Sequence, residues 1–155
     1  MRNIKRLLIL LIILISPFIV SLNAYAENDT STPGGQIKYD MPYPGMLPDN
    51  PLYFLKTTRD KIVSILISDP LKKSEFSLIA SDKRLLAAMM LVSKGKAELA
   101  ITTISKSNNY FKIAIDEYRK AKGLGRETGA IPGNLLLSSQ KHKELLGSVL
   151  ANIPK

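Results

Sequence analysis

The residues of this chain best suited to acid–base chemistry are Glu75 and Asp82, which lie seven residues apart in one helical stretch. Seven residues are about two turns of an α-helix, so both carboxyl groups share a face and could act as general acid and general base in a hydrolase. Arg84, Lys83 and Arg59 are near enough to pair with them instead, and structural ion pairs use the same residue types. We therefore expect an ion pair between the first two helices here, with a hydrolase as the weaker alternative.

Other catalytic or metal-binding arrangements have little support in the sequence. The chain has no Cys and one His, His142, which lies between Lys141 and Lys143. A metal site would need distant carboxylates, and the flanking lysines oppose a bound cation, so we expect an exposed surface histidine. The Gly-rich stretch 123–133 lacks the lysine and the preceding strand of a phosphate-binding loop. The sequence thus predicts no enzyme, no metal site and no cofactor.

A proline- and tyrosine-rich arm at residues 39–49 carries the densest sequence signal. Prolines fix φ and remove backbone donors, so the arm should be extended, with a Pro-Gly turn. It could present aromatic rings and a polyproline surface to a peptide or a glycan. The residues that would form this binding surface are Tyr39, Tyr43, Pro44 and Tyr53. In the alternative, which we favour, the arm wraps over the helices, and Tyr43, Met46 and Leu47 fill the core.

Beyond the arm, apolar residues recur at three- and four-residue steps, as in amphipathic helices. Asn50-Pro51 and Asp69-Pro70 indicate helix starts, because Asn and Asp cap free amides and Pro fits the first turn. Gly95 can take the left-handed conformation that ends a helix. The expected helices span residues 51–67, 70–93, 96–122 and 134–151.

The apolar sides of these helices predict which residues form the core. In the first helix the apolar side consists of Leu52, Leu55, Ile62, Val63 and Leu66. In the second helix the inward residues should be Phe76, Ile79, Leu86, Met89 and Met90. No stretch alternates long enough to indicate a strand, so the predicted fold class is all-α, a small bundle of about four antiparallel helices preceded by the extended arm. The alternative is one long helix through Gly95.

The N-terminal residues 1–26 are typical of a secretory signal peptide. Three basic residues precede a sixteen-residue apolar stretch, and Ala24-Tyr25-Ala26 offers a cleavage site between Ala26 and Glu27. We therefore expect a secreted or extracytoplasmic protein. In the alternative, an uncleaved segment anchors the chain, although sixteen residues fall short of the ~20 that a spanning helix needs. Residues 27–38 are polar and should form a flexible linker to a helical domain at 39–155.

The positive charge of the chain has to be considered together with this expected export. The formal net charge is +9, and the signal peptide holds three of the 22 basic residues, which leaves 19 against 13 acidic ones, about +6. These bases come singly or in pairs along every helix, as on solvated helix faces. We expect no nucleic-acid partner, and at most weak contact with an anionic membrane or wall surface.

Three segments of the domain resemble a family of uncharacterised exported helical domains in bacteria and archaea. They are Leu47–Lys56 (LPDNPLYFLK), Asp69–Glu75 (DPLKKSE) and Ile79–Leu85 (IASDKRL), where Ile79 replaces the usual Leu. The resemblance implies an extracytoplasmic helical module, and it brings no known reaction, ligand or catalytic residue. The predicted function is that of an exported, non-enzymatic helical domain for protein interaction or envelope structure, whose partner is an unknown protein or envelope component.

Overall fold

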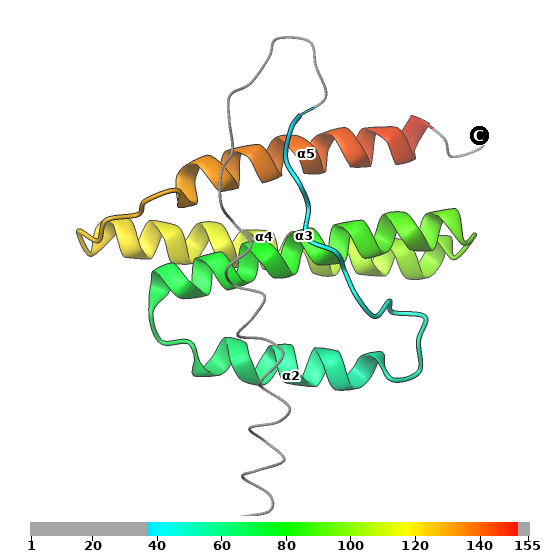
Figure 1. Ribbon diagram of the computed structural model, residues 1–155, viewed down its shortest axis with the longest axis horizontal. Coiled ribbons are helices and arrows are strands. Elements are labelled where there is room, and N and C mark those ends of the chain that lie inside the picture. The colour runs from blue at the N-terminus through cyan, green and yellow to red at the C-terminus, as the bar shows by residue number, and fades with distance from the viewer. Residues whose placement is uncertain (1–36, 152–155) are drawn as a thin grey trace, which may run out of the picture. The chain divides into compact units, whose positions relative to one another are not determined.

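The computed structural model describes residues 37–151, and all regular structure within them is helical (Figure 1). Successive helices run in opposite directions (Figure 1). The helices are α2 (Tyr53–Leu66), α3 (Pro70–Ser93), α4 (Ala97–Gly123) and α5 (Ile131–Ala151). The predicted all-α bundle of four helices is therefore confirmed. The expected signal peptide, its cleavage site between Ala26 and Glu27, and most of the expected linker lie outside the described residues.

Local capping interactions fix the ends of α3. The carboxylate of Asp69 accepts hydrogen bonds from the backbone amides of Leu71, at 2.9 Å, and Lys72, at 3.2 Å. These bonds satisfy amides that have no partner inside the helix. After Ser93 the chain reverses through Gly95, whose φ of 71° favours glycine. α3 and α4 therefore form a hairpin and not one long helix.

Two helix starts differ from the expected positions by a few residues. α5 begins at Ile131, three residues earlier than expected, because Pro132 fits the first turn, where its missing N–H costs no hydrogen bond. α2 begins at Tyr53, two residues later than expected. The Asn50 side chain accepts a hydrogen bond from the amide of Leu52 at 2.9 Å, so Asn50 and Pro51 form a turn before the helix.

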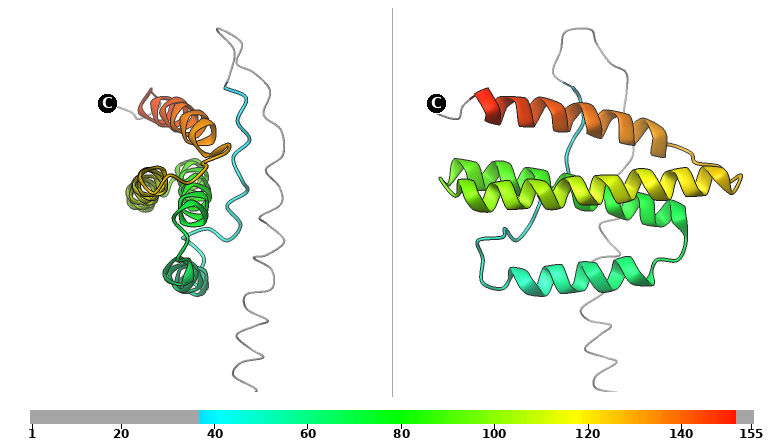
Figure 2. Two further views of the ribbon diagram at one scale, coloured as in Figure 1. Left: turned by 90° about the vertical axis from the view of Figure 1, so that its left-hand side faces the viewer. Right: turned by 180° about the vertical axis from the view of Figure 1, so that it is seen from behind.

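α3 occupies the centre of the described fold. α4 lies along one side of α3, α5 and α2 lie on opposite sides of it, and the arm crosses it on the side away from α4 (Figure 2). Of the 24 residues of α3, 13 are buried, whereas α2 buries only Asp60. A helix covered on several sides needs apolar or small residues around its whole circumference.

Small residues at seven-residue steps line the interface between α3 and α4. They are Ser74, Ser81 and Ala88 on α3, and Ala100, Ser107 and Ala114 on α4. The hydroxyl of Ser81 donates to the carbonyl oxygen of Ser107 at 2.9 Å, and the hydroxyl of Ser107 donates to the carbonyl oxygen of Ser81 at 2.8 Å. Ser74 donates to the carbonyl of Ala114 at 2.7 Å. Bonds from side chains to the opposite backbone require close helices, which only small side chains allow.

The predicted core residues of α3 are only partly those observed, although Met89 packs against a core cluster. Phe76 is buried as expected, but Ile79, Leu86, Met89 and Met90 are only partly buried. The apolar core instead joins α3, α4 and α5 through Leu78, Ala114, Ile131 and Leu135. A second cluster of Ala88, Leu91 and Ala100 closes the hairpin end.

Candidate functional site

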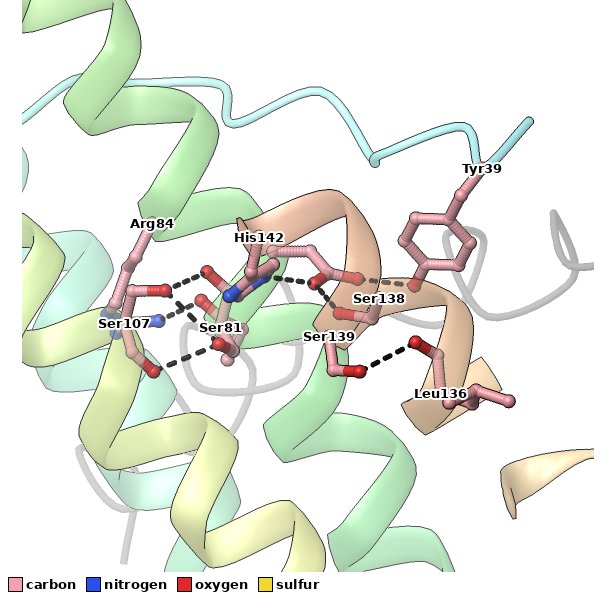
Figure 3. A network of polar contacts seen from close by, with 10 residues as sticks. Tyr39, Ser81, Arg84, Ser107, Leu136, Ser138, Ser139 and His142 are labelled. Carbon is pink, nitrogen blue, oxygen red and sulfur yellow. Dashed lines mark hydrogen bonds and ion pairs between the residues drawn. The ribbon is translucent and has the colours of Figure 1, made fainter. Parts of the chain in front are cut away.

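A buried carboxylate, Asp82 of α3, joins three parts of the fold. Its side chain is fully buried, and its Oδ2 accepts a hydrogen bond from the hydroxyl of Tyr39 in the arm at 2.5 Å. Its Oδ1 accepts from the hydroxyl of Ser138 at 2.6 Å and lies 2.8 Å from Nε2 of His142, both on α5 (Figure 3). Three polar partners offset the cost of removing the carboxylate from water. We call these four residues the Asp82 centre.

His142 is buried, so the prediction of an exposed surface histidine was wrong. Only 6% of it is exposed, and its ring packs against Phe111 with the ring centroids 5.1 Å apart. Ser138 and His142 are four residues apart, which places both on the side of α5 that faces Asp82. The flanking lysines do not expose His142, because residues adjacent in a helix point in different directions.

The expected pairing of Glu75 and Asp82 with basic residues is not what forms. Asp82 binds the arm and α5, and Glu75 is exposed on α3. Arg84 and Arg59 pair instead with Asp60 of α2, at 3.5 and 2.9 Å. The ion pair between the first two helices therefore exists, but its carboxylate belongs to Asp60.

The chemical groups of the Asp82 centre are not arranged as a catalytic triad. In a triad, the histidine lies between the nucleophilic hydroxyl and the carboxylate. Here Ser138 and His142 both contact the carboxylate, and all four members of the centre are buried. Within residues 37–151, no group of three or more His, Asp or Glu side chains could hold a metal ion. The geometry suits a structural anchor that fixes the arm and α5 on α3.

A second polar group lies between α2 and α3. Besides its ion pair with Asp60, Arg84 donates to the carbonyl of Ala80 at 2.9 Å and lies 3.9 Å from the centroid of the Tyr110 ring. Lys56 of α2 donates to the carbonyl of Pro44 in the arm. Burial lowers the pKa of Lys56 to about 8, because the charged ammonium loses hydration there. The inward side of α2 thus carries two charged residues, Asp60 and Lys56.

The large apolar side chains of α2 point away from α3. They are Leu52 at the start of the helix and Phe54, Leu55, Ile62, Ile65 and Leu66 within it, and they are between 43% and 80% exposed. Arg59 and Lys61 flank this surface, which we call the α2 outer face. The prediction that Leu52, Leu55, Ile62 and Leu66 face the core was therefore wrong. Tyr53, Lys56, Asp60, Val63 and Ile67 take the inward positions.

The four residues proposed to bind a peptide or glycan do not share one exposed surface. Tyr39 and Pro44 are buried, and Tyr53 is partly buried. Tyr43 is 72% exposed. The arm does pack over the helices, as favoured from the sequence, but Tyr43 and Met46, which were expected in the core, are exposed, and Leu47 is only partly buried.

Sequence reasoning missed the roles of Asp60, Ser138 and His142. The one local signal for the Asp82 centre is the four-residue spacing of Ser138 and His142, with both polar side chains on the side of α5 that carries Leu135. Asp60 had no such signal, because it stands among charged residues that are usually solvated.

The comparisons with known proteins give a family for the chain. No curated protein and no solved structure matches it. No helix in the described range is long and apolar enough to span a membrane. The model of a domain of unknown function (DUF5667) matches residues 45–155, which include α2 to α5, the Asp60 ion pair and Asp82, but not Tyr39. The match confirms the resemblance to an uncharacterised domain family, and the chain belongs to the DUF5667 family.

Proposed function

We propose that this chain is an extracytoplasmic, non-enzymatic interaction domain that docks on another component of the cell envelope through the α2 outer face. The observation that carries the proposal is the concentration of large apolar side chains on one exposed side of α2. Scattered apolar residues are normal on protein surfaces, but a contiguous group of this size is typical of an interaction site.

The inward contacts of α2 hold this face toward the solvent. A helix free to roll about its axis would bury Phe54 and Ile65 against α3, since burial of each side chain gains about 1.5–3 kcal/mol. The Asp60–Arg84 ion pair and the hydrogen bonds of Lys56 to the arm oppose that rotation. These contacts of Asp60 and Lys56 therefore keep the apolar face exposed.

The other parts of the proposal have separate support. The N-terminal pattern of basic, apolar and small residues supports an extracytoplasmic location. The engagement of both Asp82 oxygens, with Glu75 pointing to solvent, supports a non-enzymatic role, because the two carboxylates do not open into a common site. Peptide or glycan binding by the arm is a second candidate, favoured only by the exposed ring of Tyr43.

Photo-cross-linking in intact cells tests the proposal. A photoreactive phenylalanine derivative replaces Ile65, which is 80% exposed on the α2 outer face, and in a matched control it replaces Ile101, which is 67% exposed on α4. We expect adducts with an envelope component from position 65 and few from position 101. Equal adduct yields at both positions, or recovery of the protein from the cytoplasm, would contradict the proposal.

A further inference from the structure

The α2 outer face has the shape of an exposed ridge. α2 has 14 residues, a length of about 21 Å at 1.5 Å per residue. It lies at the edge of the helices, next to α3, and Lys56 joins it to the arm (Figure 2). Leu55, Ile62 and Leu66 follow steps of seven and four residues along the ridge, with Phe54 and Ile65 beside them. Amphipathic helices that lie on a lipid bilayer insert a ridge of this kind into the boundary between headgroups and acyl chains.

The charges on and around α2 are strongly unbalanced. The only acidic residue of the helix, Asp60, is buried and already paired with two arginines. The cationic side chains on α2 and on the adjoining part of α3 are Lys56, Arg59, Lys61, Lys83 and Arg84. With Asp82, which precedes Lys83 on α3, five cations against two carboxylates leave an excess of three positive charges. Lys61 and Arg59 border the apolar ridge, where lipid phosphates would lie.

The carboxylates before and after α2 do not neutralise this excess. Asp49 lies 3.1 Å from the ammonium of Lys94 and 2.9 Å from that of Lys96. Asp69 lies 2.8 Å from the guanidinium of Arg126 and also caps α3. Each of these acidic groups is already matched by a cation from another part of the chain, so a partner for α2 has to bring its own negative charge.

The same charges disfavour a second copy of the chain as the occupant. In a two-fold symmetric pair, the α2 helices would face each other. Arg59 and Lys61 of one copy would then approach those of the other, and α2 has no exposed carboxylate to separate them. Like charges at such an interface cost several kcal/mol.

We propose that the α2 outer face binds the surface of an anionic lipid bilayer, with the apolar ridge inserted at the headgroup boundary and Lys61 on the lipid phosphates. This inference rests on the proposed docking role of the same face. It assigns to that role a partner of defined chemistry, a membrane surface rich in anionic headgroups.

A tryptophan reporter tests the inference, because the chain contains no tryptophan. The variant Ile65→Trp places the reporter on the ridge, and Ile101→Trp serves as the matched control on α4. The full chain, in the form that cells produce, is mixed with vesicles of phosphatidylcholine alone or with added phosphatidylglycerol. We expect a shift of the Ile65→Trp emission to shorter wavelength, and its quenching by brominated acyl chains, only with phosphatidylglycerol present. The Ile101→Trp emission should not change.

A charge variant tests the role of the flanking cations. Adding Lys61→Gln to the reporter chain should weaken the response to phosphatidylglycerol about fivefold, since one cation near an anionic surface contributes about 1 kcal/mol. The matched control is Lys106→Gln, which removes an exposed cation of α4. An equal loss in both variants would show that net charge alone attracts the chain, and would overturn the inference.

Each remaining outcome separates the inference from the proposed function. A response of Ile65→Trp that is independent of phosphatidylglycerol, or equal responses at both reporter positions, would overturn the inference. No vesicle response, combined with protein adducts from position 65 in cells, would overturn the inference and leave the proposed function standing. Adducts between two copies of this chain would identify a second copy as the occupant. No response and no adducts would remove both proposals.

Discussion

α3 and α2 are neighbours in the chain, but α3 buries several large apolar side chains, such as Leu85 and Leu91, whereas α2 leaves most of its own exposed. α3 buries small and polar side chains, including Ser81 against α4 and Asp82 against the arm and α5. α2 exposes its large apolar side chains, pairs its Asp60 with Arg84 of α3 and donates hydrogen bonds from Lys56 to the arm. Whether a side chain is buried in this protein therefore depends on how close the neighbouring helix lies and on which polar partners it supplies, and not on hydrophobicity alone.

The comparison predicts different sensitivities for the two helices. The interior around α3 depends on residue size and on matched hydrogen bonds, so a single substitution there affects several elements. The attachment of α2 depends on the Asp60–Arg84 ion pair and on the hydrogen bonds of Lys56, so it should respond to the charge of Lys56 and therefore to pH. Four predictions test this contrast.

The largest effect is expected for Asp82→Ala, which removes the acceptor shared by Tyr39, Ser138 and His142. Removal of one member of a buried, hydrogen-bonded charge network costs about 3–5 kcal/mol, because its partners stay buried without a bond. Urea unfolding followed by circular dichroism measures this loss. The matched control is Glu75→Ala on the same helix, which should change stability by no more than about 0.5 kcal/mol. Equal losses in the two variants would contradict the structural role of the Asp82 centre.

The next effect is expected for Ser81→Leu at the interface of α3 and α4. A larger side chain forces the helices apart and removes the reciprocal bonds with Ser107, so the free energy of unfolding should fall by about 3 kcal/mol. Ser105→Leu, the same substitution at an exposed position of α4, should leave stability within about 0.5 kcal/mol. Thermal unfolding of the two variants in parallel gives the comparison. A tolerated leucine at position 81 would mean that the helices are not held together by small residues.

A smaller effect is expected for Tyr39→Phe, which keeps the ring and removes the hydroxyl that bonds Asp82. The loss should be about 1.5–3 kcal/mol, the range for a hydrogen bond to a charged group. The arm should also become more sensitive to limited proteolysis. Tyr43→Phe is the matched control, since this ring is exposed. The same proteolysis pattern in both variants would show that the bond does not hold the arm.

Helix positions could be predicted from the sequence because their signals are local. Asp69 bonds amides two and three residues away, and Gly95 ends α3 by its own backbone conformation. Such features need no knowledge of the neighbouring helices. The predicted and observed bounds of α3 are the same for this reason.

The buried faces could not be predicted, because they depend on neighbours that are distant in sequence. Large apolar residues occur all around α3, so periodicity does not identify the side that α4 contacts. Ser81 and Ala88 lie at that interface because their small side chains allow the two helices to approach closely. On α2 the apolar side was correctly identified as one face, but periodicity does not say whether a second helix covers it. Asp82 meets partners 43 to 60 positions away, which no local pattern reveals.

The smallest effect is a pH dependence above about pH 8 that arises from Lys56 of α2. Burial lowers the pKa of Lys56 to about 8 from an ordinary value of 10.5. Between about pH 8 and 10 the unfolded chain keeps a proton on Lys56 that the folded chain has released, so the free energy of unfolding should rise with pH. Lys83 has a pKa lowered by burial and contributes in the same direction, whereas Tyr53, whose pKa is raised by burial, opposes the rise only above about pH 10.

Replacement of Lys56 by methionine should reduce this rise, since Met carries no proton to release. Lys56 is partly exposed, so the change in slope should be only a fraction of the ~1.4 kcal/mol per pH unit that corresponds to one full proton. Lys61→Met, on the exposed side of the same helix, should leave the slope unchanged. Urea unfolding at pH 7, 8, 9 and 10 measures all three proteins, and the contribution of Lys83 cancels in the comparison. Identical slopes would mean that the charge of Lys56 is solvated in the folded chain, and that α2 is held by packing, as α3 is.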